Sequence, residues 1–188
     1  MKIKYGFLLF AVLFHIAAFT QSINRSKFAF EMPPGYILLD SASGDFNQDG
    51  LRDYIIVLKN LSEDSLTDSA RPLIILLGNK KQALDLFARN DSVVYCKACG
   101  GVFGDPYQGI TIKKQYFSID HYGGSSWRWT RNTTFRYDKA SRKFLLHRDG
   151  GESYHTSDPD KTTKYFEHKS HYGKLFFLNG EVTKFSKK

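Results

Sequence analysis

The clearest chemical pattern in the sequence is an acidic stretch over residues 44–53, which reads GDFNQDGLRD. If Asp45 is counted as position 1, side-chain oxygens fall at positions 1, 3, 5 and 9, and the residue at position 7 offers its carbonyl. Calcium binds about six to eight oxygen ligands, and Gly50 at position 6 supplies the sharp turn that such a loop needs. The spacing therefore predicts a structural calcium site with the ligands Asp45, Asn47, Asp49, Leu51 and Asp53. The alternative is an Asp/Asn-rich turn that binds no metal.

The surroundings of this loop differ from those of an EF-hand. Position 12 is Ile56, where an EF-hand has a bidentate Glu, and the loop runs directly into the apolar run Tyr54–Leu58. The stretch is similar to the calcium loops of FG-GAP and VCBS-type β-repeats, which carry D-x-N-x-D-G-x-x-D followed by a strand. This resemblance covers about fourteen residues, and one copy is present where those families have several. It implies a calcium ion that clamps a strand–loop–strand unit.

A second group of chemically capable residues lies at Asp120, His121, Ser125 and Ser126. These are the residue types of a nucleophile triad, and they keep a secreted hydrolase open as an alternative function. Adjacency in sequence is not triad geometry, however, and the G-x-S-x-G elbow is absent. We therefore expect a flexible loop between two strands and no catalytic residue here.

The N-terminus indicates export. Residues 1–20 begin with two basic residues, Lys2 and Lys4, and continue as an apolar run to Phe19, before the polar Gln21. A basic start followed by an apolar run is the order of a secretory signal peptide. The run is shorter than the roughly 20 residues of a membrane-spanning helix, so we expect cleavage near Thr20 rather than a retained anchor. The prediction is a secreted or periplasmic protein with no stable membrane span after cleavage, in which residues 21–188 form a single β-rich domain.

Export changes how the charge is interpreted. The chain has 188 residues and a net charge of +8, and its 41% hydrophobic content excludes a disordered tail or a polytopic membrane protein. Residues 1–20 carry two Lys and no acidic residue, so residues 21–188 keep 25 basic and 19 acidic residues, a net charge of +6. An exported protein seldom meets cytosolic nucleic acid, and we expect none as a partner. The charge favours an anionic envelope polysaccharide or an acidic protein partner.

The two cysteines, Cys96 and Cys99, are predicted to form a disulfide, because an exported protein folds in an oxidising compartment. Two alternatives are a thiol-disulfide oxidoreductase and a metal site. A redox C-x-x-C opens a helix that lowers the pKa of the first thiol, whereas Gly100 and Gly101 follow this pair and argue against a helix. Zinc would need two further ligands, and His121 and His155 are guesses without matching spacing.

Short runs rich in β-branched and aromatic residues alternate with Gly, Asn, Asp and Ser, and no segment keeps a 3.6-residue apolar period for three turns. The sequence predicts a mainly β fold: a single antiparallel sandwich or open barrel-like domain with little helix beyond the signal peptide. Gln82–Arg89 could instead form a short helix, but the turns predicted at Gly78-Asn79 before it and Asn90-Asp91 after it favour a hairpin strand. Asn60–Ala70 and Asp149–Thr162 are predicted loops. The expected strands are Tyr36–Leu39, Asp53–Leu58, Leu73–Leu77, Gln82–Arg89, Val93–Tyr95, Ile110–Ile112, Tyr116–His121, Trp127–Tyr137, Lys143–His147, Thr163–Glu167 and Leu175–Leu178.

The Trp127–Tyr137 strand shows the clearest alternation. One face is aromatic and is predicted to lie in the core, with Arg131 as a discordant residue that either sits at the sheet edge or pairs with a carboxylate. The other face carries Arg128 and Arg136, which are predicted to contact acidic groups of a ligand because an Arg fork suits carboxylates.

Residues 96–137, with CKACGGVFGDPYQGI and HYGGSSWRWT, resemble a pattern of uncharacterised secreted bacterial proteins that carry a similar Asp-rich loop upstream. The resemblance implies an export-dependent β-rich domain and brings no catalytic residue. The predicted function is a calcium-stabilised, non-catalytic domain that binds an envelope polysaccharide or protein partner. The alternative is a secreted hydrolase or a thiol-disulfide oxidoreductase.

Overall fold

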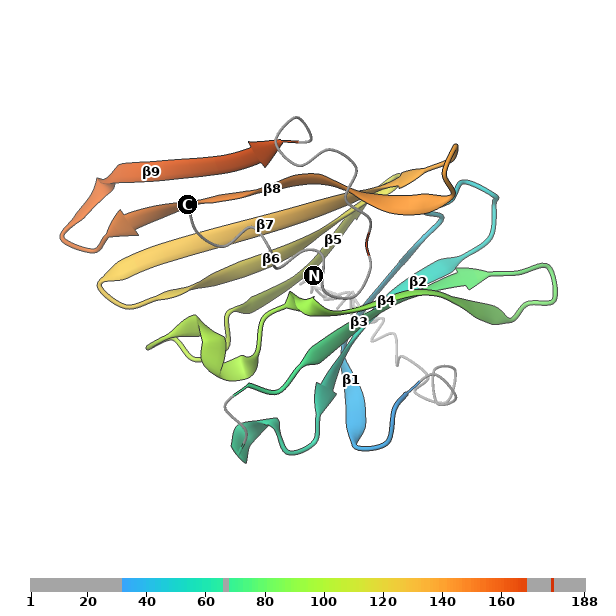
Figure 1. Cartoon of the computed structure of the whole chain (residues 1–188), viewed down its shortest axis with the longest axis horizontal. Coiled ribbons are helices and arrows are strands. Elements are labelled where there is room, and N and C mark those ends of the chain that lie inside the picture. The colour runs from blue at the N-terminus through green and yellow to red at the C-terminus, as the bar shows by residue number, and fades with distance from the viewer. Residues whose placement is uncertain (1–31, 66–67, 169–176, 178–188) are drawn as a thin grey trace, which may run out of the picture.

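The computed structural model describes residues 32–65, 68–168 and 177. Within them, nine strands form two antiparallel sheets of four and five strands, and the strand order in each sheet follows the chain (Figure 1). The predicted mainly β, antiparallel fold is confirmed. The strands are β1 (Tyr36–Gly44), β2 (Asp53–Asn60), β3 (Arg71–Gly78) and β4 (Leu84–Val94) in the first sheet, and β5 (Tyr107–Lys113), β6 (Tyr116–Gly124), β7 (Trp127–Asp138), β8 (Lys143–His155) and β9 (Asp158–His168) in the second.

Two short 3₁₀ helices complete the described elements, η2 (Glu63–Ser65) and η3 (Lys97–Gly100). Among the described residues, no helix has the length and apolar character needed to cross a membrane. The signal peptide predicted over residues 1–20 lies outside the described residues, and so does the strand predicted at Leu175–Leu178, except for Phe177.

The four-stranded sheet is built around two strands that are apolar on both faces. β2 reads DYIIVLKN and β3 reads RPLIILLG, and the side chains along their centres are buried without alternation. Such continuous runs are typical of strands covered on both sides. One face packs against the five-stranded sheet, and the other forms a second apolar cluster: Ile56, Leu58, Ile74, Leu76 and Leu84.

The five-stranded sheet alternates between a buried and a polar face. Along β6, Phe117, Ile119 and His121 are buried, while the residues between them are partly exposed. In β7, Thr133 and Phe135 are buried on the same side. The predicted inward face of Trp127–Tyr137 is therefore correct at its centre, although Trp127 itself is 61% exposed.

Two predictions about loops and turns are wrong. Asp149–Thr162 is not a loop, because β8 continues to His155 and pairs with β9 from Asp158 onward. Gly150 and Gly151, which suggested a loop, permit close packing instead: a Cβ on Gly151 would lie 1.9 Å from the Thr130 carbonyl oxygen. The turn predicted at Asn90-Asp91 is likewise absent.

The segment predicted as two strands, Gln82–Arg89 and Val93–Tyr95, is the single strand β4, and the helical alternative for Gln82–Arg89 is wrong. Asn90 is fully buried within it, and its side-chain oxygen accepts hydrogen bonds from the backbone amides of Ser92 and Val93. An irregular register between β3 and β4 accompanies this side-chain pairing.

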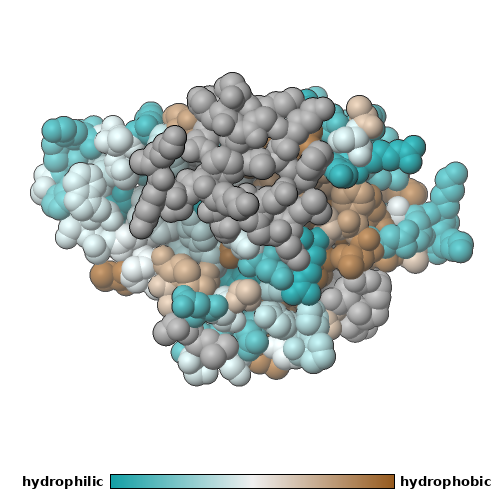
Figure 2. Space-filling view, in the orientation of Figure 1, coloured by the Kyte–Doolittle hydropathy of each residue, from teal (hydrophilic) through white to brown (hydrophobic). Residues whose placement is uncertain are grey.

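The layer between the sheets has two ends of different composition. The aromatic end is made of rings that stack or meet edge to face: Phe46, Phe117, Phe135, Phe144 and Phe177. The polar end is made of charged side chains and one histidine: Glu63, Arg71, Asp105, His121, Arg131 and Asp149. Figure 2 shows one outer face of the molecule, where apolar surface gathers over the right-hand part of the four-stranded sheet.

Candidate functional sites

The acidic loop joins β1 to β2 and is folded by hydrogen bonds from its own backbone. The Asp45 carboxylate accepts the amides of Asp49 (3.1 Å) and Gly50 (3.0 Å), and the Asp49 carboxylate accepts the amide of Leu51 (2.8 Å). Gly50 has a φ of 86°, a conformation that favours glycine. The sharp turn predicted at position 6 is thus present.

Asp53 anchors the loop at its second end. Its side chain is fully buried and accepts the amide of Phe46 at 2.8 Å and the amide of Gly78 at 2.9 Å. Burial raises the pKa of this carboxyl, because it outweighs the backbone hydrogen bonds from Gly78, Phe46 and Asn47 that lower it. The Phe46 side chain is itself buried against Phe144, so the loop is tied both to β3 and to the core.

The five predicted calcium ligands therefore lie in one compact loop, but their carboxylates are turned toward backbone amides. Among the described residues, the set of three His, Cys, Asp or Glu ligand atoms that lie within 4.8 Å of one another is Asp68, Cys96 and Cys99. The two sulfur atoms of that set are bonded to each other, so they are not free to ligate a metal.

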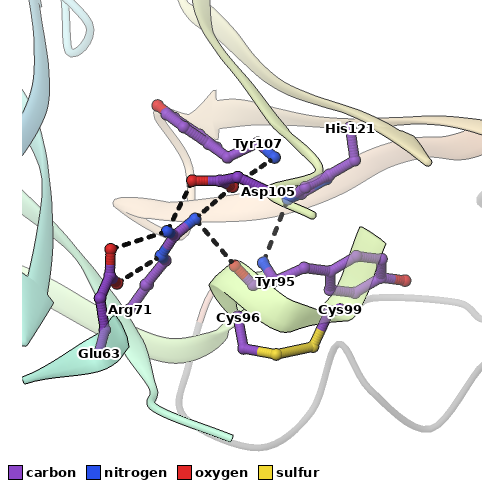
Figure 3. Close-up of a disulfide and its surroundings, with 8 residues drawn as sticks. All are labelled: Glu63, Arg71, Tyr95, Cys96, Cys99, Asp105, Tyr107 and His121. Atoms are coloured by element: carbon purple, nitrogen blue, oxygen red, sulfur yellow. Dashed lines mark hydrogen bonds and ion pairs between the residues drawn. A yellow bond between two sulfur atoms is a disulfide. The ribbon is translucent and has the colours of Figure 1, made fainter. Parts of the chain in front are cut away.

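Cys96 and Cys99 form a disulfide at the entrance to the polar end (Figure 3). The bond closes η3, a single 3₁₀ turn with Cys96 at its N-terminal boundary. The helix that a redox C-x-x-C needs behind its first cysteine is absent from this segment. Cys99 is exposed, and Lys97 between the two cysteines forms an ion pair with Asp64.

Arg71, which the sequence analysis did not identify, is the centre of a buried ion network (Figure 3). Its guanidinium is fully buried and makes two hydrogen bonds of 3.0 Å to Glu63 and two of 2.7 Å to Asp105. Burial alone would lower the pKa of Arg71, but the bonds to Asp105 and Glu63 outweigh it and raise the pKa. The network joins η2 and β3 to the segment that leads into β5.

His121 lies beside this network and is enclosed by aromatic rings. Its ring lies tilted against that of Tyr95, with 4.5 Å between the centroids, and meets Tyr107 edge to face. The Tyr95 amide donates to Nε2 at 3.2 Å, so the proton of the neutral ring is on Nδ1, which has no hydrogen-bond partner among the described residues. Burial, with Arg131 next in effect, lowers the pKa of His121 to about 4.

The residues considered for a hydrolase do not come together. Asp120 lies on the opposite face of β6 from His121, because successive residues of a strand point to opposite faces. Its side chain accepts a hydrogen bond from Asn132 at 2.5 Å. Ser125 and Ser126 lie in the turn between β6 and β7 and are exposed. An Asp120–His121 catalytic pair is therefore not formed in this structure.

Arg131 resolves the choice left open by the sequence, because it pairs with a carboxylate. Its guanidinium donates to Asp149 at 2.9 and 2.5 Å and also contacts the Tyr95 hydroxyl. Asp149 accepts a further bond from the Thr133 hydroxyl at 3.1 Å. The charge of Arg131 on the inward face of β7 is thus neutralised by Asp149 of β8, whose side chain is 6% exposed.

The two predicted ligand-binding arginines lie at opposite ends of β7. Eight residues separate Arg128 from Arg136, a distance of about 26 Å along a strand. Arg128 lies over the ring of Phe103 at 3.6 Å, and its Nη1 is buried without a hydrogen-bond partner among the described residues. Arg136 is near the turn to β8 and approaches Asp138 at 3.7 Å. They cannot contact the same acidic group.

Three large apolar side chains are exposed at the end of the five-stranded sheet that carries Arg128. Val102, Phe103 and Trp127 are 82%, 47% and 61% exposed. The Val102 amide donates to the Gly124 carbonyl at 3.1 Å, which brings the loop after η3 against the β6–β7 turn. Phe103 thereby lies on the face of the sheet that carries Arg128, while Trp127, the preceding residue of β7, points to the opposite face. The ring of His155 meets Trp127 edge to face at 5.2 Å. We call Val102, Phe103, Trp127, Arg128 and His155 the Trp127 surface.

Comparison with known proteins adds no relative: no protein-family model, curated protein or solved structure matches this chain.

Proposed function

We propose that the protein is an exported, calcium-stabilised and non-catalytic domain that binds an envelope polysaccharide through the Trp127 surface. The observation that carries this proposal is the exposure of three large apolar side chains, Val102, Phe103 and Trp127, at one end of the five-stranded sheet. Arg128 lies over the Phe103 ring there. Exposed aromatic rings offer flat apolar faces to sugar rings, and an arginine adds a charged fork for an acidic substituent.

The position of this surface supports a ligand that extends beyond it. The Trp127 surface is at the end of the five-stranded sheet, and the outer face of that sheet continues from Phe103 and Arg128 with polar side chains, including Asp120, Asn132 and Thr134. A polymer that crosses this face meets such polar groups in sequence.

The binding experiment uses affinity electrophoresis in gels that contain extracted envelope polysaccharide. We expect W127A and F103A to weaken binding about 5–10-fold, since an aromatic contact of this kind contributes about 1–1.5 kcal/mol. L86A is the matched control, because Leu86 is 54% exposed on β4 in the other sheet. Retention of full binding by W127A and F103A would refute the proposal.

The calcium part of the proposal rests on the donor set and on one buried charge. Asp45, Asn47, Asp49 and the Leu51 carbonyl supply oxygens on the exposed side of the loop. Asp53 is fully buried, and its partners among the described residues are backbone amides, including those of Phe46 and Gly78, and no cation. A divalent cation at the loop would balance that charge and would hold β1 and β2 together.

We expect calcium to bind with a Kd on the order of 10⁻⁴ to 10⁻³ M, which suffices outside cells. At several millimolar calcium the linked stabilisation is about 1–2 kcal/mol and raises the Tm by roughly 2–8 °C. Calorimetric titration and thermal melting test this with D49N, which should lose both effects, and with D160N on β9 as the matched control. The absence of heat and of a Tm shift in the parent protein would overturn the calcium proposal.

A further inference from the structure

We propose that a pocket at the end of β7 opposite to the Trp127 surface binds a single acidic sugar, a hexuronate. The pocket has a volume of about 280 Å³ and is lined by Gln48, Gln115, Arg136, Tyr137, Asp138 and Lys139. It shares no residue with the Trp127 surface, and the outcome for one site is independent of the outcome for the other.

Three separate segments build the pocket. Gln48 comes from the acidic β1–β2 loop, Gln115 from the β5–β6 turn and the remaining residues from the end of β7 and the turn that follows. The Tyr137 amide donates to the Gln115 carbonyl at 2.9 Å, and the Gln48 side-chain amide donates to the Gln115 side-chain oxygen at 3.0 Å. In Figure 1 the β1–β2 loop and the β7–β8 turn lie at the same end of the molecule.

The two glutamines leave hydrogen-bonding groups for a ligand. Once Gln48 has donated to Gln115, the Gln48 side-chain oxygen and the Gln115 side-chain NH₂ group have no partner within the part of the chain that the structure describes. One is an acceptor and the other is a donor, and adjacent sugar hydroxyls can satisfy both.

The lining of the pocket has two cations, Arg136 and Lys139, and one anion, Asp138. Lys113 at the end of β5, Lys114 and Arg142 lie nearby in sequence, and Asp49 and Asp53 of the acidic loop act on Tyr137. Asp138 forms an ion pair with Arg136 at 3.7 Å, beyond hydrogen-bond distance, and accepts both the amide and the hydroxyl of Ser141. A ligand carboxylate could therefore add the two parallel hydrogen bonds that a guanidinium makes, which Asp138 does not make to Arg136.

Size and shape favour one sugar ring over a polymer or a small inorganic anion. A volume of about 280 Å³ is at the lower limit of small-molecule pockets. The Tyr137 ring, held in place by Phe87 and Phe144, provides an apolar wall for the C–H face of a sugar. An inorganic phosphate would use the cations and leave the two amides and the ring without a role.

The test titrates the purified protein with D-galacturonate, with D-galactose, which lacks the carboxylate, and with inorganic phosphate. We expect saturable binding of galacturonate, with shifts in the NMR signals of the Gln48 and Gln115 side-chain amides, and no saturation with galactose. Equal binding of galactose would contradict recognition of the carboxylate. Phosphate that binds as well as galacturonate and competes with it would show a general anion site and overturn the assignment to a sugar.

Variants locate the site. We expect R136Q to weaken galacturonate binding at least about tenfold, as expected for a hydrogen bond to a charged group, and K139Q to weaken it less. R89Q is the matched control, because Arg89 and Arg136 have 38% and 37% exposed side chains and each approaches one Asp. Lys139 is exposed, so K139Q remains informative if R136Q folds poorly. Unchanged binding in both pocket variants would refute the proposal.

Discussion

The layer between the two sheets is filled in two different ways along its length. At the aromatic end, near the acidic loop, Phe117 stacks on Phe135 and meets Phe144 edge to face, with ring centroids 5.2 and 5.3 Å apart. At the polar end, near the disulfide, Arg71 and Arg131 each hold a carboxylate in a two-pronged hydrogen-bonded pair.

The change occurs on several strands in the same direction. On β3 the inward residues run from Ile75 and Leu73 to Arg71, and on β6 they run from Phe117 and Ile119 to His121. β7 changes likewise from Phe135 through Thr133 to Arg131. Each end is therefore formed by residues from several strands and is not the result of a single polar residue in an apolar core.

This difference teaches that one core can be stabilised by two mechanisms. The aromatic end gains free energy from apolar area removed from water, and it tolerates some change of shape. The polar end gains little from burying charge itself, because desolvation opposes the attraction, and it depends on every donor having an acceptor. At the polar end, removing one member of an ion pair is therefore more destabilising than replacing both members with apolar residues.

The largest expected effect is at the aromatic end. F117A removes a fully buried ring that contacts Phe135, Phe144 and Phe177. We expect it to lower the free energy of unfolding by about 3–5 kcal/mol, the cost of a large cavity. Urea unfolding measures the change, with F166A on the exposed side of β9 as the control. A loss as small as that of the control would show that Phe117 is not part of a tightly packed core.

The next effect tests the polar end. R71M leaves Glu63 and Asp105 without their shared cation, and we expect a loss of about 3–4 kcal/mol. Asp105 is partly exposed and can be hydrated, so most of the penalty arises from Glu63, which is 5% exposed.

The double variant R71M/E63L should therefore be more stable than R71M, because no unpaired buried charge remains. The same unfolding experiment compares the two. If the double variant is less stable than R71M, then the network acts by direct attraction and the contrast drawn between the two ends is wrong.

His121 should give the polar end a pH dependence that the aromatic end lacks. Its pKa is about 4 in the folded protein, against about 6.5 in an unfolded chain. The unfolded chain therefore binds a proton that the folded protein does not bind between these values, so stability is full above pH 6.5 and falls as the pH drops toward 4. The expected fall is about 3 kcal/mol.

H121Q keeps a hydrogen-bond acceptor for the Tyr95 amide but does not titrate. We expect its free energy of unfolding to change less than that of the parent between pH 7 and pH 4, while H155Q, on the surface, behaves like the parent. An equally steep fall in H121Q would assign the pH dependence to other groups.

The smallest effect concerns the disulfide at the entrance to the polar end. Replacing both Cys96 and Cys99 with Ser opens a very short loop, so we expect a loss of about 2 kcal/mol. Thermal unfolding of the double variant and of the reduced parent should agree. A much larger loss in both would mean that the disulfide holds the Arg71 network in place and does more than close its own turn.

Much of the fold was predictable because its signals are local. Alternating and continuous apolar runs located β1 to β9 to within a few residues at most ends, since a strand must bury one face or two. The failures lie where glycine and asparagine act through contacts that are distant in sequence. Gly151 accommodates Thr130 of the neighbouring strand, and Asn90 stabilises an irregularity inside β4.

The sites divide in the same manner. The acidic loop and the cysteine pair were identified from spacing alone, because their members are neighbours in the chain. The Arg71 network joins residues from 63 to 105, and no spacing rule connects them. An arginine at the start of the apolar run RPLIILLG was the available signal, but it does not name a partner.

The sequence by itself determined the β-rich class, the inward face of β7 and the turn of the acidic loop, because hydrophobic alternation and glycine geometry are properties of adjacent residues. Only the tertiary structure decided that Arg131 meets Asp149 and that Arg71 joins Glu63 to Asp105. Those facts depend on which strands pair and in what register, and a one-residue change of register would reverse every side chain.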